Sequence, residues 1–371
     1  MKVIADKDNL FDLLTWHGKG SDSGLVRVSV AEDNGAATIE SASKDNGWQG
    51  STLDTMGSQA GQAAFSVARI LAQKRLGRRT DQITLELDGN SVISTVGRST
   101  ASSPAVPDIP EFWRPQGDEP DPFTVVAEVD TTSLAWLLKT GDAMRSGDPT
   151  LPTRAATLIV KDGTVSIHST DTYKMGFGQI ESTVTGHDST YYLSPADFLS
   201  PLSIMNSAET VELIEHNGHL GLRGAGSIML RASMASGPPK MDAFHDNALA
   251  TLQESTPLIL PVSDFTDALG GVGMGENGAT LLEINEDHIV ISNANASSSA
   301  EGTTKAEVEA EVPEEACGSS FKFNAANASA TLKQARTNEI AMTRTNRMVI
   351  FAEPNTHDSE TPFIANIALV Q

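Results

Sequence analysis

One sequence pattern recurs six times along the 371 residues, and it constrains the fold more than any other feature. In each copy a short stretch of strand character leads into a helix-like segment, and a β-hairpin with a polar turn follows. The hairpins are predicted at 25–40, 83–96, 156–168, 211–222, 280–291 and 339–351. Asn-Gly or Asp-Gly stands in the first four turns, and these pairs tolerate the positive φ angles of tight hairpins. The chain is therefore predicted to repeat one α+β motif.

The helix-like segments begin at capping residues and carry apolar residues at helical spacing. Ser194 and Pro195 form a favourable start, because proline fits the first helical turn. Pro201 is expected to kink or shorten the same helix. The predicted helices are 8–16, 66–76, 131–144, 194–205, 263–269 and 324–335, and the strands before them are 2–5, 62–65, 123–129, 190–193, 257–261 and 319–323.

The spacing of the repeats predicts three domains. Alternate helices begin roughly 125 residues apart, so two copies of the motif make one domain. The predicted domains are 1–121, 122–253 and 254–371, with joints within 115–122 and 248–256. Each domain is expected to hold two helices and two antiparallel sheets.

Charge and cysteine content exclude several classes of protein. The 48 acidic and 26 basic residues give a net charge of −22, which argues against a generic nucleic-acid binder but is compatible with a small basic surface. The single cysteine, Cys317, rules out an internal disulfide framework and a structural cysteine-zinc site. No apolar run reaches the length of a membrane span, and the first residues do not resemble a signal peptide, so a cytosolic location without membrane contact is expected.

Catalytic, cofactor and metal motifs give no convincing match. The stretch 273–278 fits G-x-G-x-x-G, but it follows a helix and precedes a strand, the reverse of the dinucleotide-binding order. His216 and His219 flank a turn without a third ligand, so solvated turn histidines are expected there rather than a metal site. Cys317 has no evident base partner. No catalytic residue, cofactor or metal is predicted.

Several local motifs resemble segments of one family. The segment Thr170–Met175, Thr-Asp-Thr-Tyr-Lys-Met, is similar to the Ala-Thr-Asp-Ser-Tyr-Arg-Leu segment in the middle domain of the bacterial DNA sliding clamp, the β subunit of the replicative polymerase. Val96–Ser99 resembles the Ser-Gly-Arg-Ser turn of that family's first domain, and Phe321–Asn324 resembles the start of its last inner helix. Among these matches only the Thr-Asp-x-Tyr-Lys segment is moderately specific, and this divergence favours a phage-encoded or lineage-specific clamp. The segment Ile367–Gln371 also departs from the family's Met-Pro-x-Arg-Leu, which bears on the choice of partner.

The resemblance implies a function and an assembly. A sliding clamp is a non-catalytic processivity factor that closes head to tail into a homodimeric ring around duplex DNA, and polymerase and clamp loader attach to it by short peptide motifs. Helices facing the pore would contact phosphates without reading sequence. The basic residues on the predicted inner helices are Arg69, Lys74, Arg75, Arg78, Arg79, Lys139, Arg145, Lys333 and Arg336. For residues 74–79, attraction of cations by a helix C-terminus is the alternative explanation.

The resemblance also implies a partner-peptide groove between the middle and last domains. Its expected residues are Thr170, Thr172, Tyr173, Lys174, Met175, Met241, Asn324, Asn327, Met348, Ile364, Asn366 and Ile367. Tyr173 and Met175 are expected to point to the same side of an extended chain. The alternative is that Met175 and Ile364 belong to the core.

Two further functions remain open at this stage. The first is a clamp-like, β-rich interaction scaffold that has lost DNA binding, which the scarcity of bases on the predicted helices 194–205 and 263–269 favours. The second is an enzyme such as a carboxylate-based hydrolase. Ala101 and Ser103 stand where the family would place large apolar interface residues, so a weak dimer or a different ring closure is also compatible with the sequence.

Overall fold

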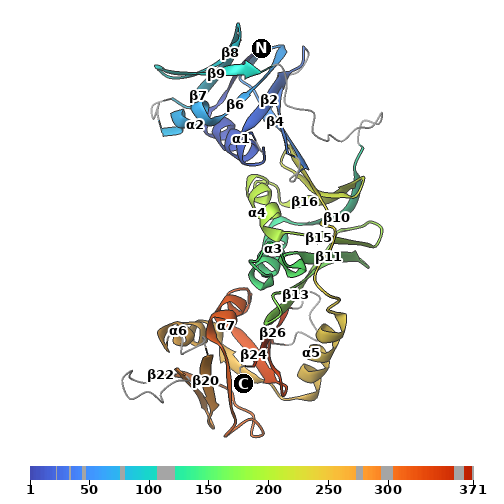
Figure 1. The fold of residues 1–371 in the computed structure, drawn as a ribbon, viewed down its shortest axis with the longest axis vertical. Helices are drawn as coiled ribbons and strands as arrows, with labels where there is room; N and C mark the ends of the chain where they lie inside the picture. The colour runs from blue at the N-terminus through green and yellow to red at the C-terminus, as the bar shows by residue number, and fades with distance from the viewer. Residues whose placement is uncertain are drawn as a thin grey trace. The chain divides into compact units, whose positions relative to one another are not determined.

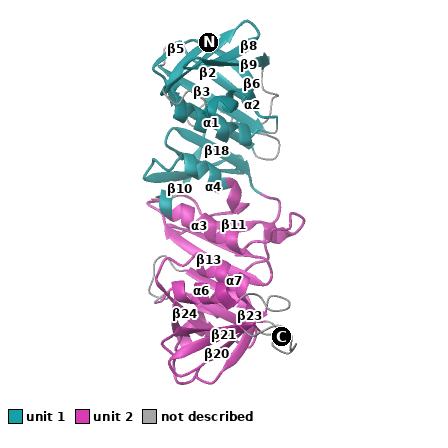
Figure 2. Ribbon diagram, turned by 90° about the vertical axis from the view of Figure 1, so that its left-hand side faces the viewer, with its two compact units in different colours: residues 1–132, 198–233 teal, residues 133–197, 234–371 magenta. Residues whose placement is uncertain are grey.

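The computed structural model describes residues 1–21, 23–32, 35–43, 47–75, 80–106, 122–272, 279–293, 304–354 and 363–369. These residues form helices and antiparallel strands in an α+β fold (Figure 1). They divide into two compact units, coloured separately in Figure 2. One unit contains Met1–Thr132 and Phe198–Ser233, and the other contains Ser133–Asp197 and Met234–Gln371. The middle predicted domain contributes to both units, and the three domain boundaries stay predictions.

The first unit is built on antiparallel strands in the order β10-β16-β17-β18-β4-β3-β2-β6-β9-β8-β7-β1-β5. Pairing of β18 with β4, Ser227 to Leu230 opposite Ser51 to Trp48, connects the strands of two predicted domains. The strands are β1 Lys2–Asp6, β2 Leu25–Val30, β3 Ala36–Ser43, β4 Gly47–Asp54, β5 Gly57–Gln59, β6 Gly61–Ser66, β7 Gln82–Asp88, β8 Ser91–Val96, β9 Ser99–Val106, β10 Thr124–Asp130, β16 Thr210–His216, β17 His219–Gly224 and β18 Ser227–Ala232.

Two helices pack against these strands. Helix α1, Lys7–Lys19, begins where the Asp6 carboxylate accepts a hydrogen bond from the Asn9 backbone N–H at 2.8 Å. Its face toward the sheet buries Leu10, Phe11 and Leu14. Helix α2 is shorter than predicted: it spans Ala68–Leu71 and continues as a 3-10 turn over Ala72–Arg75.

The second unit contains an eight-stranded sheet, β15-β11-β12-β13-β26-β25-β24-β19, and a four-stranded sheet, β22-β21-β20-β23. Pairing of β13 with β26, Lys174 to Gly178 opposite Ile367 to Phe363, joins strands of the middle and last predicted domains. The strands of this unit are β11 Ala156–Lys161, β12 Thr164–Thr170, β13 Lys174–Glu181, β14 Val184–Thr185, β15 Ser189–Leu193, β19 Leu258–Pro261, β20 Ala279–Ile284, β21 His288–Asn293, β22 Lys305–Glu309, β23 Ser320–Asn324, β24 Glu339–Arg344, β25 Met348–Ala352 and β26 Phe363–Ala368.

Helices cover both faces of the larger sheet of this unit. Their bounds are α5 Asp242–Glu254, α6 Val262–Val272 and α7 Ala325–Leu332, together with α3 Thr131–Met144 and α4 Pro195–Ile204, which have residues in both units. Strands β24 and β26 lie between α7 on one side and α5 on the other (Figure 1). Phe363, Ala365 and Ile367 of β26 therefore face the main core, whereas Ile364 faces α5.

The six predicted helices and six hairpins are confirmed as elements of the fold. Two of these turns adopt the expected positive φ angles. The angles are 51° and 77° at Asp162 and Gly163, and 49° and 77° at Asn217 and Gly218. In the second hairpin the turn is shifted by one residue, because Asp88 still pairs with Ser91. Helix α4 retains Pro201 and ends at Ile204. Asn34 of the first hairpin and the joint at 115–121 lie outside the described residues.

A helix that the sequence analysis did not predict, α5, runs through most of the predicted joint 248–256. It packs Ala248, Leu249 and Leu252 against Ile350 and Ile364. These three residues have the i, i+1, i+4 spacing of one helical face. A helix that buries such a face holds the connection between two predicted domains against the sheet. No helix among the described residues is long and apolar enough to cross a membrane.

Candidate functional site

The segment that carries the family resemblance forms a tight turn between β12 and β13. The Thr170 hydroxyl donates to the Lys174 carbonyl at 2.8 Å and accepts from the Thr172 N–H at 2.9 Å. One Asp171 carboxylate oxygen accepts from the N–H groups of Tyr173 and Lys174, at 2.9 and 2.8 Å. These bonds hold Thr172 at a φ of 83°, in the left-handed region. Thr170 and Asp171 thus fix the turn itself.

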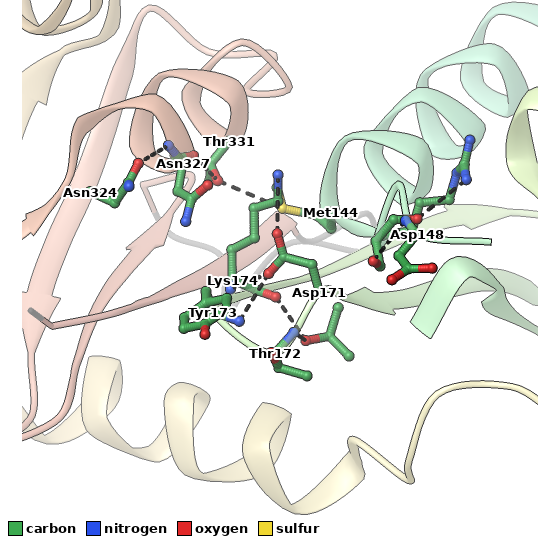
Figure 3. A network of polar contacts seen from close by, with 12 residues as sticks. Met144, Asp148, Asp171, Thr172, Tyr173, Lys174, Asn324, Asn327 and Thr331 are labelled. Atoms are coloured by element: carbon green, nitrogen blue, oxygen red, sulfur yellow. Dashed lines mark hydrogen bonds and ion pairs between the residues drawn. The ribbon is translucent and has the colours of Figure 1, made fainter. Parts of the chain in front are cut away.

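The turn presents two side chains of different character. Tyr173 is 69% exposed, and its carbonyl accepts from the Ala368 N–H at 2.8 Å, which ties the turn to the end of β26. The Lys174 ammonium lies 3.6 Å from the Asp171 carboxylate, and its side chain extends toward Met144 and Thr331 (Figure 3). The bend at Thr172 precedes both Tyr173 and Met175, and the expectation that these two side chains point to the same side stays a prediction.

A small hollow lies beside the turn, between the sheet and α5. It is lined by His168, Met175, Gly176, Phe177, Met241, His245, Ile364 and Asn366. Met175 and Asn366 are direct cross-strand partners, and so are Phe177 and Ile364, so these four side chains share one face of the sheet. The structure therefore brings together Met175, Met241, Ile364 and Asn366 from the predicted groove.

Two histidines and a phenylalanine form the aromatic part of this hollow. The Phe177 ring centroid lies 4.1 Å from that of His245 and 4.9 Å from that of His168. Burial lowers the pKa of His168 to about 4, with a smaller contribution from the nearby His245 ring. Burial likewise lowers the pKa of His245, against the opposing effect of Asp246. Both rings are therefore neutral near pH 7.

Sequence reasoning missed these three aromatic residues, although two signals were present. His168 and Phe177 lie directly opposite each other once the hairpin register of β12 and β13 is known. His245 precedes Ala248, Leu249 and Leu252 at helical spacing, so recognition of α5 would have placed it on the helix face that meets the sheet.

The other predicted groove residues occupy different positions. Asn324 caps α7, where its side chain accepts from the Asn327 N–H at 2.9 Å (Figure 3). Met348 is half-buried in β25, two residues before Ile350 and on the same face. Ile367 is a core residue with 1% of its surface exposed. Asn324, Asn327, Met348 and Ile367 do not line the hollow.

The predicted DNA-contacting residues that the structure describes in the first unit lie in α2 and in the 3-10 turn that follows it. Arg69, Lys74 and Arg75 are exposed, and the Lys74 ammonium lies 2.6 Å from the Asp12 carboxylate of α1. Arg78 and Arg79 lie outside the described residues.

The basic residues of the second unit differ in how far carboxylates already engage them. Lys139 of α3 and Lys333 at the end of α7 are exposed. The guanidinium of Arg145 lies 2.6 Å from the Asp142 carboxylate. That of Arg336 pairs with the buried carboxylate of Glu353 at 2.9 Å. A phosphate would have to compete with these carboxylates for Arg145 and Arg336.

The described residues contain no group of three or more His, Cys, Asp or Glu side chains that could hold a metal ion. The expectation of a solvated His216 is wrong: this ring is buried, and its Nδ1 forms a hydrogen bond with the Pro122 carbonyl at 2.8 Å. Its turn lies at the end of β16 and packs against Phe123, which precedes β10. Cys317 is exposed.

A larger hollow of about 740 Å³ is strongly acidic. Its lining includes Asp287, Glu307, Glu309, Glu311 and Glu339. A hydrogen bond from His288 lowers the pKa of Asp287.

No family model and no curated protein matches the amino-acid sequence. Solved structures match it along its whole length. The DNA polymerase III β subunit from Thermotoga maritima is 14% identical with a TM-score of 0.80, covering 100% of this chain and 99% of that chain. A DNA polymerase sliding clamp from Pseudomonas aeruginosa is 12% identical with a TM-score of 0.81, and a DnaN sliding clamp from the same organism bound to griselimycin is 11% identical with a TM-score of 0.82, both with the same coverage. The chain has the fold of the bacterial DNA sliding clamps.

Proposed function

We propose that the protein is a DNA sliding clamp: a non-catalytic processivity factor of the cytosol that encircles duplex DNA and tethers a polymerase to it. The observation that carries the proposal is the agreement in fold with three solved clamps over 100% of this chain. A tether of this kind acts by raising the local concentration of the polymerase at its template, which needs topology and a docking site but no catalytic group.

The DNA contact in this proposal is electrostatic. Exposed Arg69, Lys74 and Arg75 in one unit, and Lys139 and Lys333 in the other, would attract phosphates without reading bases. The net charge of −22 on the chain limits the electrostatic attraction between the protein and DNA phosphates. Closure of the ring, rather than binding affinity for DNA, would therefore keep the protein on the duplex.

The partner contact is the hollow beside the 170–175 turn. Met175, Met241, Phe177 and Ile364 supply apolar walls there, and methionine side chains adapt readily to a peptide. The polymerase and the clamp loader would each bind by a short segment that inserts an apolar anchor between β13, β26 and α5.

The assembly in this proposal is a head-to-tail homodimer. Light scattering behind size-exclusion chromatography should give a mass of about 78 kDa, twice the 39.2 kDa of one chain. In the topological test, the diluted protein is allowed to form its dimeric ring in the presence of nicked circular plasmid. The complex is then washed in high salt. A clamp stays on the circle and is released when a restriction enzyme cuts the plasmid once. Equal retention on circular and linear DNA would contradict the proposal.

The second candidate is a clamp-like scaffold that does not bind DNA. The ion pairs of Lys74, Arg145 and Arg336 favour the scaffold, because in each pair a carboxylate occupies a basic side chain that a DNA-binding pore would use for phosphate. A strict monomer that binds the polymerase-derived peptide but is not retained on circular plasmid would support the scaffold instead.

A further inference from the structure

Two residues that line the small hollow each carry a buried hydrogen-bond acceptor without a partner. Asn366 is only 4% exposed, and its Oδ1 atom is fully buried without a hydrogen bond. Nε2 of His245 is buried and unpartnered as well. Both residues line the same hollow as Met175, Phe177 and Met241. Because burying a polar atom without a partner destabilises a protein, a water molecule or a ligand group that donates a hydrogen bond to these atoms is favoured.

Both atoms are acceptors rather than donors. Oδ1 of Asn366 is a carbonyl oxygen. For His245, Nδ1 lies 3.5 Å from the Asp246 carboxylate, so that nitrogen keeps the proton and Nε2 carries the lone pair. Burial lowers the pKa of His245, which keeps the ring neutral and preserves this lone pair. A group that satisfies the hollow must therefore donate a hydrogen bond.

The remainder of the lining is apolar or aromatic. Met175, Phe177, Met241 and Ile364 contribute the walls, and Gly176 contributes backbone between two of them, while Met144 fills the space on its other face. The free volume is about 10 Å³, close to what one water molecule occupies. A larger group enters only if the walls move, and Met175 and Met241 are the flexible residues that can rotate aside.

We propose that this hollow selects a peptide anchor with an aromatic ring and a hydrogen-bond donor at its tip, namely tyrosine. The ring would replace the methionine contacts beside Phe177, and the hydroxyl would donate to Asn366 Oδ1 or to His245 Nε2. This inference rests on the proposed function of the hollow as the partner-peptide site, and it adds the chemistry of the anchor. A purely aliphatic or phenylalanine anchor would leave both acceptors unpaired, whereas the tyrosine hydroxyl would satisfy one of them.

The test compares two peptides from the clamp-binding segment of a bacterial polymerase that differ only in Tyr or Phe at the anchor position. Binding to the full chain is measured by fluorescence anisotropy. The Tyr peptide should bind at least about tenfold more tightly, because a site built around a hydrogen bond rejects the analogue that lacks it. In Asn366→Leu, which keeps the size and removes the acceptor, the Phe peptide should gain affinity and the difference should shrink.

Two controls separate this inference from folding and from the proposed function. Asn346→Leu changes an exposed asparagine in the turn between β24 and β25 and should leave the Tyr preference intact. His245→Phe tests the second acceptor, and thermal melts check that all variants fold. Equal binding of Tyr and Phe peptides to the natural chain would overturn the anchor selection while leaving the peptide site in place. Binding of neither peptide would overturn both.

Discussion

The guanidinium of Arg336 stacks on the indole of Trp136, with Cζ 3.9 Å from the ring centroid. Trp136 lies on α3 and donates from Nε1 to the Gln334 carbonyl, just after α7, at 2.7 Å. Phe363 of β26 meets the same indole edge-on at 6.4 Å. One side chain of the middle predicted domain thus holds two parts of the last one, the segment after α7 and strand β26, by a cation–π contact, a hydrogen bond and ring packing.

This arrangement makes Trp136 a key residue for the stability of the second unit. Trp136→Ala should lower the free energy of unfolding by roughly 3 kcal/mol, since it removes a large packed ring. Lys139→Ala, three residues along the same helix and exposed, serves as the control and should change it by less than about 0.5 kcal/mol. Urea denaturation followed by circular dichroism measures both. Equal stability of the two variants would contradict the role assigned to the indole.

The same contacts distinguish Arg336 from the exposed lysines as a DNA ligand. Arg336→Ala should lower stability, because it leaves the buried Glu353 carboxylate without its ion pair, and should leave the salt dependence of DNA binding almost unchanged. Replacing Lys139 and Lys333 together should instead reduce the slope of log K against log salt by about two units. A titration of duplex DNA at several salt concentrations checks both. A large loss of slope in Arg336→Ala would show that phosphate displaces Glu353.

The basic stretch 74–79 allows a parallel test in the first unit. Replacement of Lys74, Arg75, Arg78 and Arg79 by alanine should weaken duplex binding and flatten its salt dependence, by about one unit of slope for each phosphate that is no longer neutralised. The Lys74 ion pair with Asp12 predicts a smaller effect for Lys74→Ala alone than for Arg75→Ala. An unchanged slope in the fourfold variant would mean that the cluster only complements the end of a helix.

Much of the fold could be predicted from the sequence because the local signals and the tertiary structure agree. Asp162-Gly163 and Asn217-Gly218 locate their hairpins since few residues adopt positive φ at low cost. The helix 131–144 was predicted to the residue. Helix α5 was missed because its apolar face, Ala248, Leu249 and Leu252, is small. This face is stabilised by packing on Ile350 and Ile364, which the local sequence does not reveal.

The candidate site was less predictable for the same physical reason. A family resemblance could name Met175, Ile364 and Asn366, but their neighbours depend on the pairing of β13 with β26, nearly 190 residues apart. The burial of His168 and the fit of His245 against Phe177 follow from that pairing and from the docking of α5. Likewise, an arginine such as Arg336 looks like a free pore base until Glu353 and Trp136 are placed around it.

The buried His17 predicts a pH dependence of stability. Its ring receives hydrogen-bonding contacts from the Ser41 and Ser51 hydroxyls at 2.9 and 3.1 Å, and burial lowers its pKa from 6.5 to about 3. Below pH 6.5 the His17 ring is protonated in the unfolded chain but stays neutral in the folded chain. Its contribution to stability is therefore complete above pH 6.5 and falls by up to about 1.4 kcal/mol per pH unit until the pKa near 3 is reached.

His17→Gln, which can still hydrogen-bond the two serines, should remove this part of the pH dependence. Urea denaturation of both proteins between about pH 7 and pH 5 measures the difference in slope. His168 has a similarly lowered pKa and should keep part of the slope in the variant. Identical slopes for His17→Gln and the natural chain would mean that the ring is protonated in the folded state.

The partner groove is best tested at Met175, because the residue lines the hollow without belonging to the buried core clusters. Ile364 is unsuitable: it is 2% exposed and packs under α5, so Ile364→Ala should cost about 2–4 kcal/mol of stability whatever its role in binding.

Met175→Glu places a charge against Phe177 and Met241 and should weaken binding of the polymerase-derived peptide by more than about tenfold, since the charge must be desolvated when the anchor enters. Its melting temperature should change little, because Met175 is only half-buried and the new carboxylate can turn to solvent. Lys161→Glu, at an exposed position on β11, two strands from β13 in the same sheet, introduces the same side chain outside the hollow and is the control. Anisotropy and thermal melts on both variants decide the matter. A stable Met175→Glu protein that binds the peptide as the control does would show that the anchor docks elsewhere on the clamp fold.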